Sequence, residues 1–182
     1  MSFFDSLKTS QTAANGQNYA VVLADIPCNL AQLQAMPEAA LTKPEHTAAL
    51  TIAALCLYPA NKDAALEMLE YLHGPKGLST YDKQFIADRF RDKDYVPRSY
   101  FRGATPANNY EPAIPYTLDF FENPYSRDQL ADGYLTLHIR SGGADSPRQI
   151  KLRNKPSTGQ WFLWEQFLLS DIRQPAAADP WA

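Results

Sequence analysis

Three consecutive stretches decide the fold: LTLHIR at residues 135–140, SGGADSP at 141–147 and IKLR at 150–153. In the first and the third, apolar and polar side chains alternate with a period of two, which is typical of strands with one buried face. The stretch between them has the glycine, serine, aspartate and proline content of a turn. The sequence therefore predicts an antiparallel hairpin.

Further strands are expected on both sides of this hairpin. Residues 116–120 alternate in the same way, and residues 161–164 follow the turn sequence PSTG. A short apolar run at 19–23 predicts one more strand near the start of the chain. We expect the sheet part to span residues 95–166, followed by a C-terminal tail at 167–182.

Residues 29–92 have the pattern of about four helices. Asn29, Asn61 and Ser79 each stand where a side chain can cap the first turn of a helix. The sequence TKPE at 42–45 fits a capping box, with proline in the first turn. The helix behind it is apolar nearly all round, which predicts that it is the most buried helix.

Separate runs of helices and strands indicate an α+β fold, in which about four N-terminal helices pack on a C-terminal antiparallel sheet or meander. The chain of 182 residues has the length of one domain. Because neither part looks self-sufficient, we expect a single domain over residues 19–182. Residues 1–18 are polar and irregular, which predicts a flexible arm.

Proline is concentrated where the helical and sheet parts meet. Five of the 14 prolines stand at positions 97, 106, 112, 115 and 124. Each lacks a backbone donor and disfavours helix at the residue before it, so we expect extended structure broken by loops over residues 97–125. Seven of the ten tyrosines lie between Tyr81 and Tyr134, which makes this region the first place to look for a function.

Composition and charge exclude several classes of protein. A hydrophobic content of 45% is typical of a folded chain, and a net charge of −3 lacks the basic footprint of a nucleic-acid-binding domain. The longest apolar segment, 47–58, is too short to cross a membrane. The first residues lack the pattern of a secretory signal. We therefore expect a cytoplasmic protein without a nucleic-acid or membrane partner.

Motifs give no support for an enzyme. The sequence has no G-x-S-x-G elbow, no phosphate-binding glycine loop and no zinc-type Cys/His spacing, so it assigns no catalytic residue, cofactor or metal. Two sparse cysteines favour free thiols over a disulfide, with Cys56 buried in its apolar helix and Cys28, between Pro27 and Asn29, the more exposed of the two. The segment HGPKG at 73–77 resembles an anion-binding loop, but we interpret it as a helix end followed by a turn.

Our leading hypothesis is a non-enzymatic module that binds a partner protein. Residues 134–156 hold five basic side chains against one acidic side chain, and the predicted hairpin places several of them on its outer face. Tyrosine and tryptophan are enriched at protein interfaces. The candidate partner face comprises Tyr100, Tyr110, Tyr116, His138, Arg140, Lys151, Arg153 and Trp164.

The competing hypothesis is an enzyme or a small-ligand carrier. Its site would be a pocket between the helices and the sheet that gathers a polar cluster. The candidates for this pocket are Tyr81, Arg89, Arg98 and Asp119.

Four long segments carry a resemblance to a known family. They are PKGLSTYDKQFI at 75–86, YVPRSYF at 95–101, SGGADSPR at 141–148 and QWFLWEQ at 160–166, continued by DIR and DPW near the C-terminus. The chain resembles a family of uncharacterised bacterial proteins that contain a domain of unknown function. The resemblance runs from about Asn29 to Ala182. It implies a bacterial, soluble, single-domain protein and brings no activity or catalytic residues.

Overall fold

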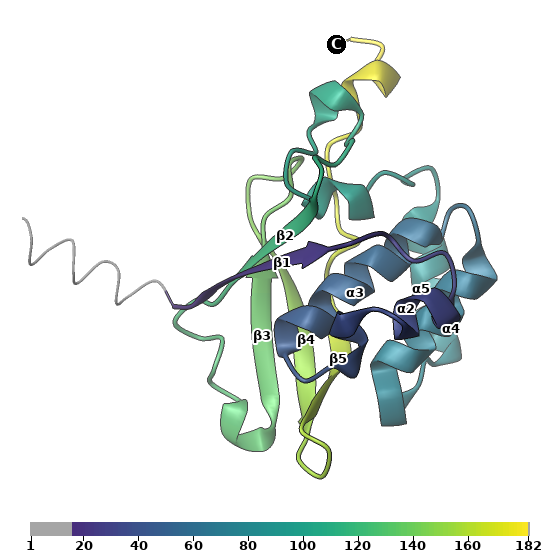
Figure 1. Ribbon diagram of the computed structural model, residues 1–182. Coiled ribbons are helices and arrows are strands. Elements are labelled where there is room, and N and C mark those ends of the chain that lie inside the picture. Colours follow the sequence, from purple (N-terminus) through teal and green to yellow (C-terminus); the bar gives the residue numbers. More distant parts are fainter. Residues whose placement is uncertain (1–15, 182) are drawn as a thin grey trace, which may run out of the picture.

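The computed structural model describes residues 16–181 and contains a five-stranded antiparallel sheet in the order β1-β2-β3-β4-β5 (Figure 1). The strands are β1 Asn18–Leu23, β2 Tyr116–Phe121, β3 Tyr134–Ile139, β4 Arg148–Lys155 and β5 Gln160–Gln166. Each strand predicted from the sequence is present. Of the predicted arm at 1–18, residues 1–15 lie outside the described part, and Asn18 already belongs to β1.

The predicted hairpin is confirmed as β3 and β4, with Leu135 opposite Leu152 and Leu137 opposite Ile150. Strand β1 pairs with β2 along its whole length, although the four α-helices of the described residues lie between them in the sequence. By contrast, β2 and β3 pair only through Phe120↔Ile139 and Phe121↔His138. The sheet therefore consists of a β1–β2 pair and a β3–β5 meander, joined over a short distance.

The four helices cover one face of this sheet (Figure 1). They are α2 Leu30–Gln34, α3 Pro44–Leu57, α4 Lys62–His73 and α5 Thr80–Phe90. Every residue of α3 from Thr47 to Leu55 is buried, and α3 packs against β1, β3, β4 and β5. Helices and sheet contribute to one hydrophobic core. The α+β class and the central place of α3 are thus confirmed.

Three of the expected helix caps form. The side chains of Asn29, Asn61 and Ser79 accept hydrogen bonds from backbone N–H groups in the first turns of α2, α4 and α5. The capping box expected at 42–45 is wrong. Lys43 is the residue before α3 and makes no side-chain cap bond, while Pro44 occupies the first position of the helix.

The proline-rich segment differs from the expectation in one respect. Short 3-10 turns begin at Pro97 and Pro106, because the fixed φ of proline suits the first position of a helical turn. The hydroxyls of Tyr95, Tyr100 and Tyr110 donate to carbonyls of Ile172, Leu168 and Arg173. Through these hydrogen bonds, the segment after β5 is held against residues 95–110.

In the part of the chain that is described, no helix has the length and apolar character needed to span a bilayer.

Candidate functional site

The outer face of β3–β5, opposite the helices, carries a group of cations and aromatic rings. Leu135, Leu137, Ile150 and Leu152 point toward the core and are buried. The alternation of the strands turns the intervening side chains outward. We call Lys76, Tyr134, Lys151, Arg153 and Trp164, with Lys155 at the end of β4, the basic–aromatic face.

The rings of this face hold its cations in place. The Tyr134 and Trp164 rings meet edge to face, with centroids 5.3 Å apart. The Lys151 Nζ atom lies 4.7 Å from the centroid of the Tyr134 ring. The Arg153 guanidinium lies 5.1 Å from Tyr134 and 4.9 Å from Trp164. Such cation–π contacts order long basic side chains on an open surface.

Lys76 reaches this face from the turn after α4. Its Nζ atom lies 4.4 Å from the Trp164 ring and donates a hydrogen bond to the Trp164 carbonyl oxygen over 2.6 Å. Gly74 permits the approach, because it has a φ of 57° and a Cβ there would lie 2.3 Å from the Phe162 ring. The segment 73–77 is therefore a helix end, as expected, and it also delivers a cation.

The positive charge of this face is not neutralised within the described residues. Lys76, Lys151, Arg153 and Lys155 form no ion pair there, whereas Arg102 pairs with Asp119 and Arg173 with Asp145 elsewhere on the surface. Glu165 stands opposite Lys151 in the strand register without an ion pair to it. The face thus combines ordered cations with an excess of positive charge.

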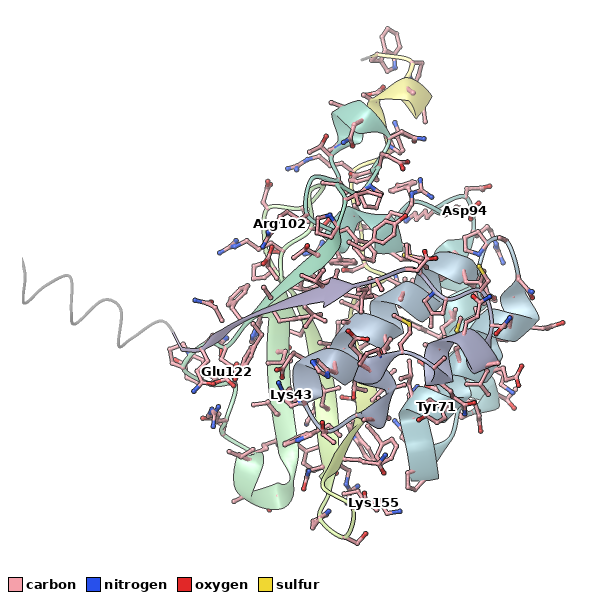
Figure 2. The ribbon with its side chains drawn as sticks, viewed as in Figure 1. Lys43, Tyr71, Asp94, Arg102, Glu122 and Lys155 are labelled. Carbon is pink, nitrogen blue, oxygen red and sulfur yellow. The ribbon has the colours of Figure 1, made fainter. Side chains whose placement is uncertain are left out.

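A hollow of about 490 Å³ lies beside these residues at the β4–β5 end of the sheet. Its lining includes Pro75, Lys76, Arg153, Lys155, Phe162 and Trp164. Figure 2 shows Lys155 at the turn between β4 and β5, away from Arg102 and Glu122. Aromatic rings and prolines form much of the wall, and the basic side chains lie around them.

A second groove, of about 280 Å³, lies between α4, α5 and β5. It shares a wall with the hollow that includes His73, Lys76 and Trp164. His73 is 7% exposed, and burial lowers the pKa of its imidazole below the ordinary 6.5. Its Nδ1 atom has no hydrogen-bond partner among the described atoms. At neutral pH this histidine is uncharged, and one of its nitrogens is left free to accept a hydrogen bond.

The structure gathers three of the eight predicted partner residues, namely Lys151, Arg153 and Trp164. Two others are not on the surface: Tyr100 is 3% exposed and Tyr110 is fully buried. Their hydroxyls bond to backbone carbonyls of the C-terminal segment. Burial explains why these two tyrosines do not form a contact face.

The remaining three predicted partner residues lie elsewhere. His138 is on the outer side of β3 but is 4% exposed and lies 3.2 Å from the Asn123 amide. Arg140 follows the end of β3 and stacks over the Phe121 ring at 5.4 Å. Tyr116 makes an edge contact with Phe101. The predicted face is therefore divided among several parts of the molecule.

The residues of the alternative pocket are also dispersed. Tyr81 lines the second groove, and Arg89 lies over the Phe85 ring on the same helix. Arg98 donates to the Asn109 carbonyl oxygen over 3.4 Å, and Asp119 pairs with Arg102. The structure does not assemble these four residues into one polar cluster.

The predicted partner face omitted Tyr134, Lys76, Lys155 and Phe162, although Lys155 is one of the five basic side chains of residues 134–156. Tyr134 is the first residue of β3 and Lys155 is the last residue of β4. Both continue the alternation of outward-facing side chains, so strand alternation was a usable signal for both. Lys76 and Phe162 gave no such signal, because their contribution depends on how the turn after α4 lies against β5.

Within the described residues, neither the Cys56 thiol nor a cluster of metal ligands supplies reactive chemistry. Burial raises the pKa of the Cys56 thiol to about 12, which disfavours a thiolate nucleophile. Over residues 16–181, no three His, Cys, Asp or Glu side chains gather as metal ligands would.

One comparison with known proteins gives a match. A family model described as "Domain of unknown function (DUF6935)" matches residues 25–176. No significant match is found among curated proteins or among solved structures.

Proposed function

We propose that this chain, which belongs to the family of domains of unknown function that it matches, is a non-enzymatic interaction module. Its basic–aromatic face binds an acidic surface of a partner protein. One observation carries the proposal: Lys76, Lys151 and Arg153 are stacked on the Tyr134 and Trp164 rings and have no carboxylate partner among the described residues.

Two physical arguments support this role. Cations held by aromatic rings lose little side-chain entropy when a partner binds, so more of the electrostatic gain is retained. Aromatic and arginine side chains are also the residue types enriched among interface hot spots. We propose that the protein acts in the cytoplasm of a bacterial cell. The two unpaired cysteines suit a reducing compartment.

The test is affinity capture from the native host with three immobilised proteins. The first is the unchanged chain, the second is Lys151→Glu/Arg153→Glu, and the control is Lys62→Glu/Lys83→Glu. The control makes the same change in net charge at exposed positions on the helical side. We expect the unchanged chain and the control to recover the same proteins, and the face variant to lose them.

Recovery of the same proteins by all three baits would overturn the proposal, as would recovery of none. The captured proteins should also leave the unchanged chain as salt is raised, because exposed charge pairs are screened over about 10 Å at 0.1 M.

A small-ligand carrier is the second candidate. The second groove favours it, because the unpartnered Nδ1 atom of His73 lies in its wall. A thermal-shift screen with metabolites tests it. The expected result is a compound that raises the Tm of the unchanged chain but not that of Tyr81→Ala, since Tyr81 lines the groove and is otherwise exposed.

A further inference from the structure

The hollow beside the basic–aromatic face combines two kinds of surface. Phe162 and Trp164 give it apolar walls, and Lys76, Arg153 and Lys155 contribute cations to the same lining. Among the described residues, no acidic side chain is part of this lining. An apolar group that binds against the apolar walls is stabilised because apolar surface is removed from water. The unpaired cations favour an occupant that carries negative charge.

The size of the hollow narrows the choice of occupant. Its volume of about 490 Å³ lies in the lower half of the range of about 300–1,000 Å³ that is typical of ligand pockets. A folded element is too large for it, but one bulky side chain with its flanking backbone is not.

We propose that the hollow receives a large apolar side chain from an acidic segment of the partner protein. This inference rests on the proposed function. An aromatic ring packs against Phe162 and Trp164. Carboxylates on either side of it meet Arg153 and Lys155 from one flank and Lys76 from the other. The segment that the module recognises is thus an aromatic residue among acidic residues.

The observations favour a peptide over a nucleic acid. Both have rings and negative charge, but a nucleic-acid-binding domain usually carries a net positive charge and this chain carries −3. The cations of the hollow are few and lie on one end of the sheet, rather than along a groove that follows a phosphate backbone.

Fluorescence anisotropy with labelled probes tests the inference. The probes are the peptides EEEWEEE, EEEGEEE and QQQWQQQ, and a single-stranded DNA heptamer. We expect EEEWEEE to bind the unchanged chain about tenfold or more tightly than any other probe, because burying one aromatic side chain and pairing its neighbours both contribute.

Substitutions in the hollow test whether the peptide EEEWEEE binds there. Lys155→Glu, at an exposed turn position, should weaken EEEWEEE binding by about tenfold, and Lys83→Glu should leave it unchanged. Trp164→Ala should abolish the preference for EEEWEEE over EEEGEEE. Its fold is checked by circular dichroism and by its Tm. Where Trp164→Ala does not fold, Phe162→Leu replaces it and should reduce the same preference.

The outcomes separate the inference from the proposed function. Equal binding of EEEWEEE and EEEGEEE overturns the inference, while face-dependent capture from the host still supports an interaction module. No binding by any peptide, alongside face-dependent capture, also overturns the inference alone. Tighter binding of the DNA heptamer overturns both the inference and the protein-partner proposal.

Discussion

At the scale of single residues, two arginine–carboxylate pairs share a geometry but differ in burial. Arg127 binds both carboxylate oxygens of Glu122, at 2.8 and 3.0 Å, and Arg102 binds both oxygens of Asp119, at 3.0 and 2.7 Å. The Glu122 side chain is only 4% exposed, whereas that of Asp119 is 54% exposed. Tyr19 also donates to Glu122. Through the Tyr19 hydroxyl, the buried Glu122 carboxylate therefore links β1 to the connection after β2.

Because of this difference in burial, we expect that replacing Arg127 and replacing Arg102 will lower the free energy of unfolding by unequal amounts. Arg127→Ala leaves a buried carboxylate without its cation and should lower the free energy of unfolding by about 1–3 kcal/mol. Arg102→Ala removes a pair that is exposed to solvent and screened by it, so this change should lower the free energy of unfolding clearly less than Arg127→Ala does. Urea unfolding of both variants beside the unchanged chain measures this. Equal losses would show that burial of Glu122 does not set the cost.

Neither pair was predictable from the sequence. Glu122 and Arg127 stand in the irregular connection between β2 and β3, where no periodicity says which charged side chain turns inward. The two cations of the face that were predicted, Lys151 and Arg153, lie where strand alternation exposes them, whereas Lys76 lies 75 residues before Lys151. Local pattern finds the former, and only the three-dimensional arrangement brings the latter to the same place.

At the scale of elements, the start of α5 differs from that of α3. The Ser79 hydroxyl accepts from the Asp82 N–H, and the Asp82 carboxylate accepts from the Ser79 N–H, each over 3.0 Å. Lys43, at the same position before α3, makes no side-chain bond. Helix α3 is held by burial on all sides, while α5 buries only Ile86 and Phe90. The exposed helix is therefore the one that depends on its cap.

We accordingly expect Ser79→Ala to lower the free energy of unfolding by about 1 kcal/mol, because the Asp82 N–H loses its acceptor and the Asp82 carboxylate loses the hydroxyl that donates to it. Lys43→Ala, which removes no cap bond, should change it by only a few tenths of a kcal/mol. Thermal or urea unfolding measures both. A loss for Lys43→Ala as large as that for Ser79→Ala would contradict the assignment of the cap.

The elements themselves were largely predictable, because each depends on a local pattern. Alternation located the strands, and Asn29, Asn61 and Ser79 located three helix starts. The short β2–β3 pairing was not predictable. Phe101 and Arg102 bond to β2 at Leu118 and Thr117, so β3 pairs with β2 only at Phe120 and Phe121. The hollow was also not predictable, because it forms between the turn after α4 and the edge strand β5, which are far apart in the sequence.

At the scale of the whole molecule, two buried histidines couple stability to pH. His73 and His138 are 7% and 4% exposed, and burial lowers the pKa of both below the ordinary 6.5. Above about pH 7 they are neutral in both the folded and the unfolded chain. As pH falls through 6.5, the unfolded chain takes up protons that the folded chain still excludes.

The free energy of unfolding should therefore decrease as pH is lowered from 7.5 to 5.5, by at most about 1.4 kcal/mol per pH unit for each histidine. His138→Gln should make this decrease smaller, because one of the two groups no longer titrates. Urea unfolding at a series of pH values gives the slopes. A slope unchanged by His138→Gln, or stability that rises toward pH 5.5, would contradict the burial argument.

The pairing of β1 with β2 also has a consequence for synthesis of the chain. About 90 residues, including the four α-helices of the described part, must be translated between these two strands. At about 5–20 residues per second on the ribosome, β1 waits roughly 5–20 s for its partner. Its sequence NYAVVL carries no charge and no proline. During that interval an uncharged strand has an unpaired backbone that another nascent chain can pair with, and early packing against α3, which contacts β1 in the folded protein, would cover one of its faces.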